Sequence, residues 1–233
     1  MSASSMTATS IWRTEMAKRR VAILISGRGS NMTALIEAAT AKDYPAEIVL
    51  VISNIAGAGG LAKAAEAGIE TATIESKAFG KDRESFERKL NEALVAHNIE
   101  LVCFAGFLRL LTPWFVKQWE GRMLNIHPAL LPSYRGLHTH ERALADGVKI
   151  HGATVHFVVP EMDSGPIVMQ GAVAVRDDDT PDTLARRVLA VEHQIYPDAL
   201  RLVAGGGTRI ENGLCKSNAK GSPDDTLISP AII

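Results

Sequence analysis

The sequence predicts an α/β fold: a doubly wound, mostly parallel sheet between layers of helices, with an antiparallel strand in the C-terminal half. Continuous apolar runs, such as residues 21–25 and 48–52, are typical of strands that are buried on both faces. Such runs alternate with amphipathic helical patterns through the first half of the chain, as expected for a parallel sheet. Two β-rich runs then follow with no helical pattern between them, so we expect them to pair antiparallel.

The first half of the chain contains three strand patterns, each followed by a helical pattern. The strands are predicted at residues 21–25, 48–52 and 71–74. The helices are predicted from residue 32 to about residue 39, at residues 61–67 and at residues 82–97. Apolar residues three or four positions apart indicate these helices, and Gly68 suits the C-terminal cap of the second helix.

The second half begins with strands predicted at residues 101–105 and 123–127. Between them, Thr112 and Pro113 are typical of the cap and first position of a short helix. The two β-rich runs lie at residues 153–159 and 167–175, and a long helix runs from Thr180 to about residue 203. We therefore expect one domain at residues 19–211, between a flexible N-terminal extension at 1–18 and a loose polar tail at 212–233.

Composition narrows the class of protein. The 233 residues are 46% hydrophobic and carry a formal net charge of −1, which gives no support for bulk electrostatic binding of nucleic acid. No apolar run approaches the ~20 residues of a membrane span, and the N-terminus lacks the apolar segment of a secretory signal. The two cysteines form no CxxC pair, which suits a reducing compartment. We expect a cytoplasmic protein, monomeric or homodimeric, that binds neither nucleic acid nor a membrane.

A glycine-containing turn joins the first strand to the first helix. Gly27 and Gly29 let the backbone approach a ligand, and the free N–H groups at the helix start favour an anion. Ser30 and Asn31 add side-chain donors. Met32 stands where a dinucleotide fingerprint has its third glycine, so the loop favours a single phosphate or phosphate ester. A purely structural tight turn is the alternative.

The combination of an amide, an imidazole and a carboxylate indicates chemistry at Asn125, His127 and Asp163. Asn125 and His127 are two residues apart on a predicted strand, so they share a face. A nearby carboxylate favours the imidazolium form of a histidine. Together an imidazolium and an amide stabilise an oxyanion, and the carboxylate moves a proton. No serine or cysteine stands in an obvious nucleophile elbow, so the attacking group is expected to come from the substrate.

Two other readings remain open at this point. His127, His138 and His140 could serve a metal hydrolase, but no carboxylate cluster completes tetrahedral zinc ligation, so we expect no metal. A non-catalytic nucleotide-binding module would explain the glycine loop and leave Asn125 and His127 without a task.

Several segments, taken in order, resemble the phosphoribosylglycinamide formyltransferase family. They are SGRGSN at 26–31, AGFLR at 105–109, LNIHPALLP at 124–132, GLHTH at 136–140 and EHQIYP at 192–197. The resemblance covers about residues 20–205. It implies a Rossmann-like formyltransferase fold. It also implies transfer of a formyl group from 10-formyltetrahydrofolate to the amine of glycinamide ribonucleotide, in the de novo synthesis of purines.

The resemblance also implies roles for particular residues. The catalytic positions are Asn125, His127 and Asp163. The positions that match the ribonucleotide site are Gly29, Ser30, Asn31 and Glu192. The positions that match the folate site are Arg83, Leu108, Arg109, Leu110, Leu111 and Asn125. The chain departs from the commonest pattern at Arg28, Pro160 and Ser164, which concerns substrate contacts and none of the catalytic positions.

Other enzymes of the same fold are the nearest rivals. A formyltetrahydrofolate hydrolase is expected to carry an additional N-terminal regulatory domain, and a methionyl-tRNA formyltransferase an additional C-terminal RNA-binding domain. Only a short extension precedes the first strand here and only a short tail follows the last helix. The loop with Ser30 and Asn31 also favours a small phosphorylated acceptor.

Overall fold

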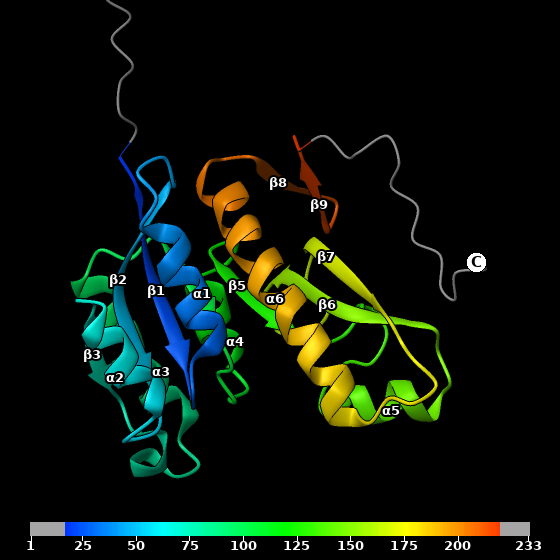
Figure 1. The fold of residues 1–233 in the computed structure, drawn as a ribbon. Helices are drawn as coiled ribbons and strands as arrows, with labels where there is room; N and C mark the ends of the chain where they lie inside the picture. The colour runs from blue at the N-terminus through cyan, green and yellow to red at the C-terminus, as the bar shows by residue number, and fades with distance from the viewer. Residues whose placement is uncertain (1–16, 220–233) are drawn as a thin grey trace, which may run out of the picture.

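A seven-stranded sheet forms the centre of the molecule in the computed structural model, which describes residues 17–219 (Figure 1). The strand order is β3-β2-β1-β4-β5-β6-β7. The strands are β1 (Arg19–Ile25), β2 (Ala46–Ser53), β3 (Glu70–Thr73), β4 (Leu101–Phe104), β5 (Met123–His127), β6 (Ile150–Phe157) and β7 (Ile167–Ala174). The first five strands pair in parallel, and β6 pairs antiparallel with both β5 and β7. The predicted fold class is thus confirmed.

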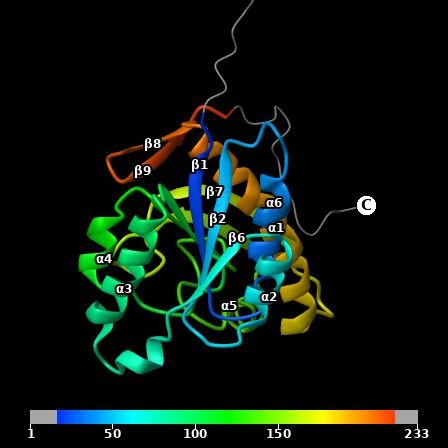
Figure 2. The same ribbon diagram turned by 90° about the vertical axis from the view of Figure 1, so that its left-hand side faces the viewer.

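Helices cover both faces of the sheet, as the two views show (Figure 1, Figure 2). They are α1 (Ser30–Ala39), α2 (Gly59–Glu66), α3 (Arg83–Ala96), α4 (Pro113–Gln118), α5 (Thr139–Ala145), α6 (Pro181–Ala204) and the short 3-10 helix η1 (Ser76–Phe79). Residues of α1, α2 and α6 share one apolar cluster with alternate residues of the strands. Residues of α3 and α4 belong to a second cluster on the opposite face. The period-two alternation of strand side chains divides the core into these two layers.

The order of the strands places a crevice beside β1. The chain runs outward from β1 to β2 and β3, then returns to β4 on the other side of β1. The loops that leave β1 and β4 therefore diverge toward opposite faces of the sheet. In open α/β sheets, ligands bind at the carboxyl ends of the strands at such a switch point.

Two regions differ from the sequence-based expectation. Helix α5 was not predicted, because its seven residues show too few apolar positions to establish a period. The predicted loose tail is wrong for residues 214–217. They form β9 (Leu214–Ser217), which pairs antiparallel with β8 (Thr208–Glu211) and lies against β7. The remaining predicted tail beyond residue 219, and the extension up to residue 16, lie outside the described residues. No helix within residues 17–219 is long and apolar enough to cross a membrane.

Candidate active site

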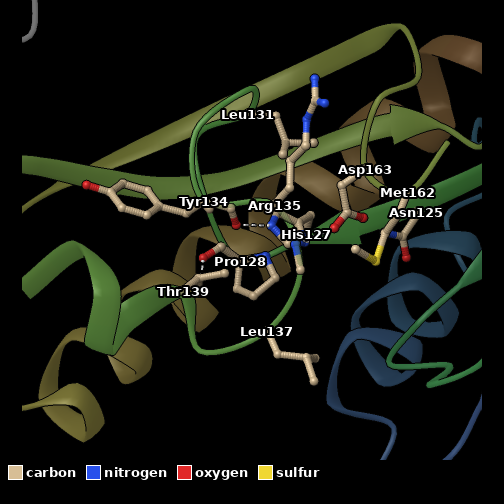
Figure 3. A network of polar contacts seen from close by, with 12 residues as sticks. Asn125, His127, Pro128, Leu131, Tyr134, Arg135, Leu137, Thr139, Met162 and Asp163 are labelled. Atoms are coloured by element: carbon tan, nitrogen blue, oxygen red, sulfur yellow. Dashed lines mark hydrogen bonds and ion pairs between the residues drawn. The ribbon is translucent and has the colours of Figure 1, made fainter.

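A cleft of about 880 Å³ opens at the carboxyl ends of the central strands. Its walls come from the start of α1, the segment after β4, the end of β5, the loop before α5, the loop between β6 and β7, and α6. Asn125, His127 and Asp163 all line it. Two separate parts of the chain, strand β5 and the loop between β6 and β7, therefore bring an amide, an imidazole and a carboxylate to one place, as Figure 3 shows.

The side-chain amide of Asn125 is oriented by a neighbouring histidine. Asn125 lies opposite His156 in the antiparallel pairing of β5 and β6, and its Nδ2 lies 3.1 Å from His156 Nε2. The other ring nitrogen of His156, Nδ1, lies 2.9 Å from the carbonyl oxygen of Phe157. Burial lowers the pKa of His156, so its ring is neutral at pH 7. These partners assign the ring proton to Nδ1, and Nε2 then accepts from Asn125.

The imidazole of His127 lies between a carbonyl and a carboxylate (Figure 3). Its Nε2 donates to the backbone oxygen of Tyr134 at 2.9 Å, and its Nδ1 lies 3.4 Å from Asp163 Oδ2. The His127 side chain is 6% exposed and that of Asp163 is 12% exposed. Oxygen acceptors on both sides of a shielded ring suit an imidazolium, which carries a donor on each nitrogen.

Asp163 occupies an unusual backbone conformation in the loop between β6 and β7. Its φ is +50°, in the left-handed region that aspartate tolerates better than most residues. Its Oδ2 accepts a hydrogen bond from the backbone N–H of Gly136 at 2.8 Å. Asp163 thereby joins its own loop to the loop that follows His127, and the carboxylate is fixed at the cleft.

The glycine loop brings two helices close together. Gly29 has a φ of +68° and directly precedes α1, whose first turn has no acidic residue and no capping side chain. A Cβ on Gly29 would lie 3.1 Å from the Cα of Gly60, and Gly60 donates a backbone hydrogen bond to Gly27 at 3.0 Å. Glycine is required where the start of α2 approaches so closely. The uncapped start of α1 remains suited to an anion.

Asn31 connects the start of α1 to α6. Its Nδ2 donates to Glu192 Oε2 at 2.6 Å, and both residues line the cleft. Asn31 is 9% exposed and its Oδ1 has no hydrogen-bond partner among the described residues. Burial raises the pKa of Glu192, and the hydrogen bond from Asn31 opposes that rise. The pair thus presents polar atoms, shielded from bulk solvent, to a ligand in the cleft.

The residues expected to bind folate divide into two groups. Leu108, Arg109, Leu110 and Leu111 line the cleft. Leu108 is 74% exposed and Leu110 61% exposed, which is unusual for leucines beside a cavity. Arg83 is the first residue of α3 and is not among the residues that line the cleft. Gly29 and Ser30 also lie outside its lining, although Asn31 belongs to it.

The other histidines are not gathered around a metal. His138 is exposed beside Glu141, whereas His140 and His151 pack edge to face with ring centroids 5.4 Å apart. Burial lowers the pKa of His140, and it lowers the pKa of His151 to about 4. Within residues 17–219, no group of three or more potential ligands is placed to hold a metal ion.

Sequence reasoning missed the groups that hold the polar residues of the cleft. His156 orients Asn125, the Tyr134 carbonyl orients His127, and the Gly136 amide holds Asp163. Two of the three are backbone groups, which every residue carries, so the sequence cannot single them out. His156 could be found only from the antiparallel register of β5 and β6, because its partner is far away in the sequence.

Comparisons with known proteins identify the family of this chain. Residues 19–200 match the family model described as formyl transferase. Phosphoribosylglycinamide formyltransferase of Escherichia coli (strain K12) is 44% identical over 186 residues, which is 80% of this chain and 87% of the relative. A crystal structure of phosphoribosylglycinamide formyltransferase from Brucella melitensis aligns with a TM-score of 0.78 at 52% identity, covering 81% of this chain and 97% of that one.

A longer relative matches in one part only. The trifunctional purine biosynthetic protein adenosine-3 of Bos taurus is 49% identical over 197 residues, or 84% of this chain. The chain matches only 19% of that relative's length. The family model spans most of the sequence, and the Escherichia coli relative is matched over most of its own length. This chain belongs to the formyl transferase family.

Proposed function

We propose that this protein transfers a formyl group from 10-formyltetrahydrofolate to the amine of glycinamide ribonucleotide, a step of de novo purine synthesis. The observation that carries the proposal is the convergence of Asn125, His127 and Asp163 on one cleft, with Nδ1 of His127 3.4 Å from Asp163 Oδ2. The relatives named phosphoribosylglycinamide formyltransferase support the choice of acceptor. Two separate cysteines and small-molecule substrates fit a cytoplasmic enzyme.

The ribonucleotide phosphate is assigned to the loop before α1. Gly29 allows close approach of the backbone, and the side chains of Ser30 and Asn31 add donors to the backbone N–H groups of an uncapped helix start. Glu192, hydrogen-bonded to Asn31, faces the same cleft and is placed to bind the remainder of the ribonucleotide. The amine then points from the α1 side toward Asn125 and His127.

The formyl donor is assigned to the wall formed after β4. Leu108 and Leu110 expose apolar surface at the cleft, where a flat ring system would cover it. Arg109 lies beside them, with its guanidinium 5.5 Å from the ring centroid of Phe86. The loop that carries Asp163 lines the same cleft, so the formyl carbon would lie close to both the acceptor amine and the carboxylate.

The mechanism is direct attack of the amine on the formyl carbon. His127 as an imidazolium and the Asn125 amide stabilise the oxyanion that develops, and each such donor contributes about 10²–10³ in rate. Asp163 receives the proton of the attacking amine, directly or through a water, and passes it toward the departing folate nitrogen. No protein nucleophile takes part, so no covalent enzyme intermediate forms.

An absorbance assay with 10-formyltetrahydrofolate tests the proposal. We expect loss of the formyl group only when glycinamide ribonucleotide is present. Loss at the same rate without the acceptor would identify a hydrolase instead. A chelator should leave the rate unchanged. A rate that falls when the chelator is added would support a metal hydrolase instead.

A further inference from the structure

A buried hydroxyl group connects the end of β1 to the wall of the cleft. Ser26 directly follows β1 and is 7% exposed. Its Oγ accepts a hydrogen bond from the backbone N–H of Leu108 at 2.9 Å and donates one to Asn54 Oδ1 at 2.6 Å. The backbone N–H of Ser26 also donates to the carbonyl of Gly106 at 3.0 Å. One residue therefore holds the segment after β4 through both its backbone and its side chain.

Asn54 extends this connection to a third loop. Its Nδ2 donates to Ser76 Oγ at 3.2 Å, and the backbone N–H of Ser76 donates to the Asn54 carbonyl at 3.2 Å. Asn54 and Ser76 are each 6% exposed. The ends of β1 and β2 and the start of η1 are thus joined by one buried chain of hydrogen bonds that terminates at Leu108.

The segment from Leu108 to residue 111 has few other backbone hydrogen bonds. Between Leu108 and Thr112, no backbone N–H donates a hydrogen bond to another residue in the described range 17–219. The next attachment is at Thr112, whose backbone N–H donates to Glu87 at 2.7 Å. Leu111 packs against the apolar cluster of α3 and α4, and the Arg109 guanidinium lies over the ring of Phe86. Leu108 and Leu110 are exposed, so packing does little to fix the Leu108 end of the segment.

We propose that Ser26 is a positioning residue for the formyl donor: its hydroxyl, oriented by Asn54, holds the 108–111 segment in the geometry that binds folate. This inference rests on the proposed function. Without the hydroxyl, the Leu108 N–H and the Asn54 Oδ1 lose their partners, and the segment is released at that point. A ligand that needs one conformation of a wall binds more weakly when that conformation is only partly populated.

Steady-state kinetics of Ser26→Ala test the inference. We expect the KM for 10-formyltetrahydrofolate to rise about tenfold, which corresponds to ~1.4 kcal/mol, with a much smaller change in kcat and in the KM for the ribonucleotide. Ser26→Thr keeps the hydroxyl and should restore most of the affinity. Ser53→Ala is the matched control, because Ser53 is fully buried at the neighbouring strand end and its Oγ bonds only to the backbone of Ile55. Equal rises of the folate KM in Ser26→Ala and Ser53→Ala would overturn the inference.

Hydrogen exchange provides a readout that does not depend on the reaction. The backbone N–H of Leu108 should lose protection in Ser26→Ala and keep it in Ser53→Ala. Persistent protection in Ser26→Ala would overturn the inference, whereas absence of formyl transfer in the unaltered protein would overturn the proposed function alone.

If Ser26→Ala does not fold, Asn54→Ala replaces it. A rise in the folate KM alone supports the inference, and an unchanged folate KM counts against it.

Discussion

At the scale of single residues, the three candidate catalytic side chains are each held in place by a neighbouring group. Asp163 is held through the Gly136 N–H, His127 through the Tyr134 carbonyl, and Asn125 through His156. Groups that are already oriented need no rearrangement when charge develops in a transition state. The cost is a backbone with φ near +50° at Asp163, a conformation that few non-glycine residues adopt.

Replacement of Asp163 by asparagine separates the proposed proton transfer by this residue from its structural hydrogen bond. The amide oxygen can still accept from the Gly136 N–H, so folding and both KM values should change little. The amide cannot carry the proton of the amine, so kcat should fall by about 10²–10⁴. Kinetics and thermal unfolding measure the two effects. Asp177→Asn is the control, because Asp177 lies on the surface beside Lys149. Near-normal turnover in Asp163→Asn would remove this carboxylate from the mechanism.

At the scale of elements, strand ends and helix starts determine where each substrate can bind. The loop before α1 contacts α2 through Gly60 and reaches α6 through Asn31. The segment after β4 lines the same cleft, and its backbone N–H groups are held by Ser26 at Leu108 and by Glu87 at Thr112. The two proposed substrate sites therefore belong to different elements and can be altered separately.

The double variant Ser30→Ala with Asn31→Ala tests the loop before α1. Hydrogen bonds to a charged group contribute about 1.5–3 kcal/mol each. The KM for the ribonucleotide should therefore rise by at least about tenfold, with little effect on the folate KM. Thr33→Ala is the control, since its hydroxyl bonds only to the Gly29 carbonyl in the same turn. Equal rises for both substrates would show that the loop is structural.

The start of α6 provides a test of stability without an effect on binding. Thr180 caps the helix, accepting from the N–H of Thr183 at 3.2 Å, while the Thr183 hydroxyl accepts from the N–H of Thr180 at 2.9 Å. Thr180→Ala should lower the free energy of unfolding by about 1 kcal/mol. Both KM values should remain unchanged, because Glu192 lies several turns further along α6. Denaturant unfolding measures the loss, and Thr180→Ser, which keeps the hydroxyl, should recover it.

At the scale of the whole molecule, strand β6 buries His151 and His156, and helix α5 holds the half-buried His140 beside His151. Burial lowers the pKa values of His140 and His156, and it lowers the pKa of His151 to about 4. The unfolded chain binds protons at these sites near the ordinary histidine pKa of 6.5, and the folded chain does not. The free energy of unfolding therefore keeps its full value above pH 6.5 and decreases as the pH falls from 6.5 toward 4.

His151→Phe should reduce this dependence on pH. Phenylalanine keeps an aromatic ring between Tyr134 and His140 but cannot take up a proton. Denaturant unfolding at several pH values between about 7 and 5 measures the slope, which should be smaller in the variant. His138→Phe is the control, because His138 is 75% exposed. An identical slope in the unaltered protein and in His151→Phe would contradict the assignment.

Much of this molecule was predictable from local pattern. Apolar runs alternating with amphipathic helices predicted the doubly wound sheet, and adjacent β-rich runs predicted the antiparallel pairing of β6 with β7. Periodicity carries this information because each side chain reports which face of its own element is buried. The prediction failed where elements are short, as in α5, or depend on a distant edge, as in β9.

The site itself divides in the same way. The order of residues placed Asn125 and His127 on one strand face, and the glycine loop at a helix start. Only the tertiary structure decided that Asp163 lies beside His127 and that His156 orients Asn125. It also decided that Arg83 is not part of the cleft lining and that Ser26 bonds to Leu108. The physical reason is that these contacts depend on strand register and loop packing between distant segments. Such contacts are selected by the free energy of the whole fold and leave no periodic signal in any one stretch of sequence.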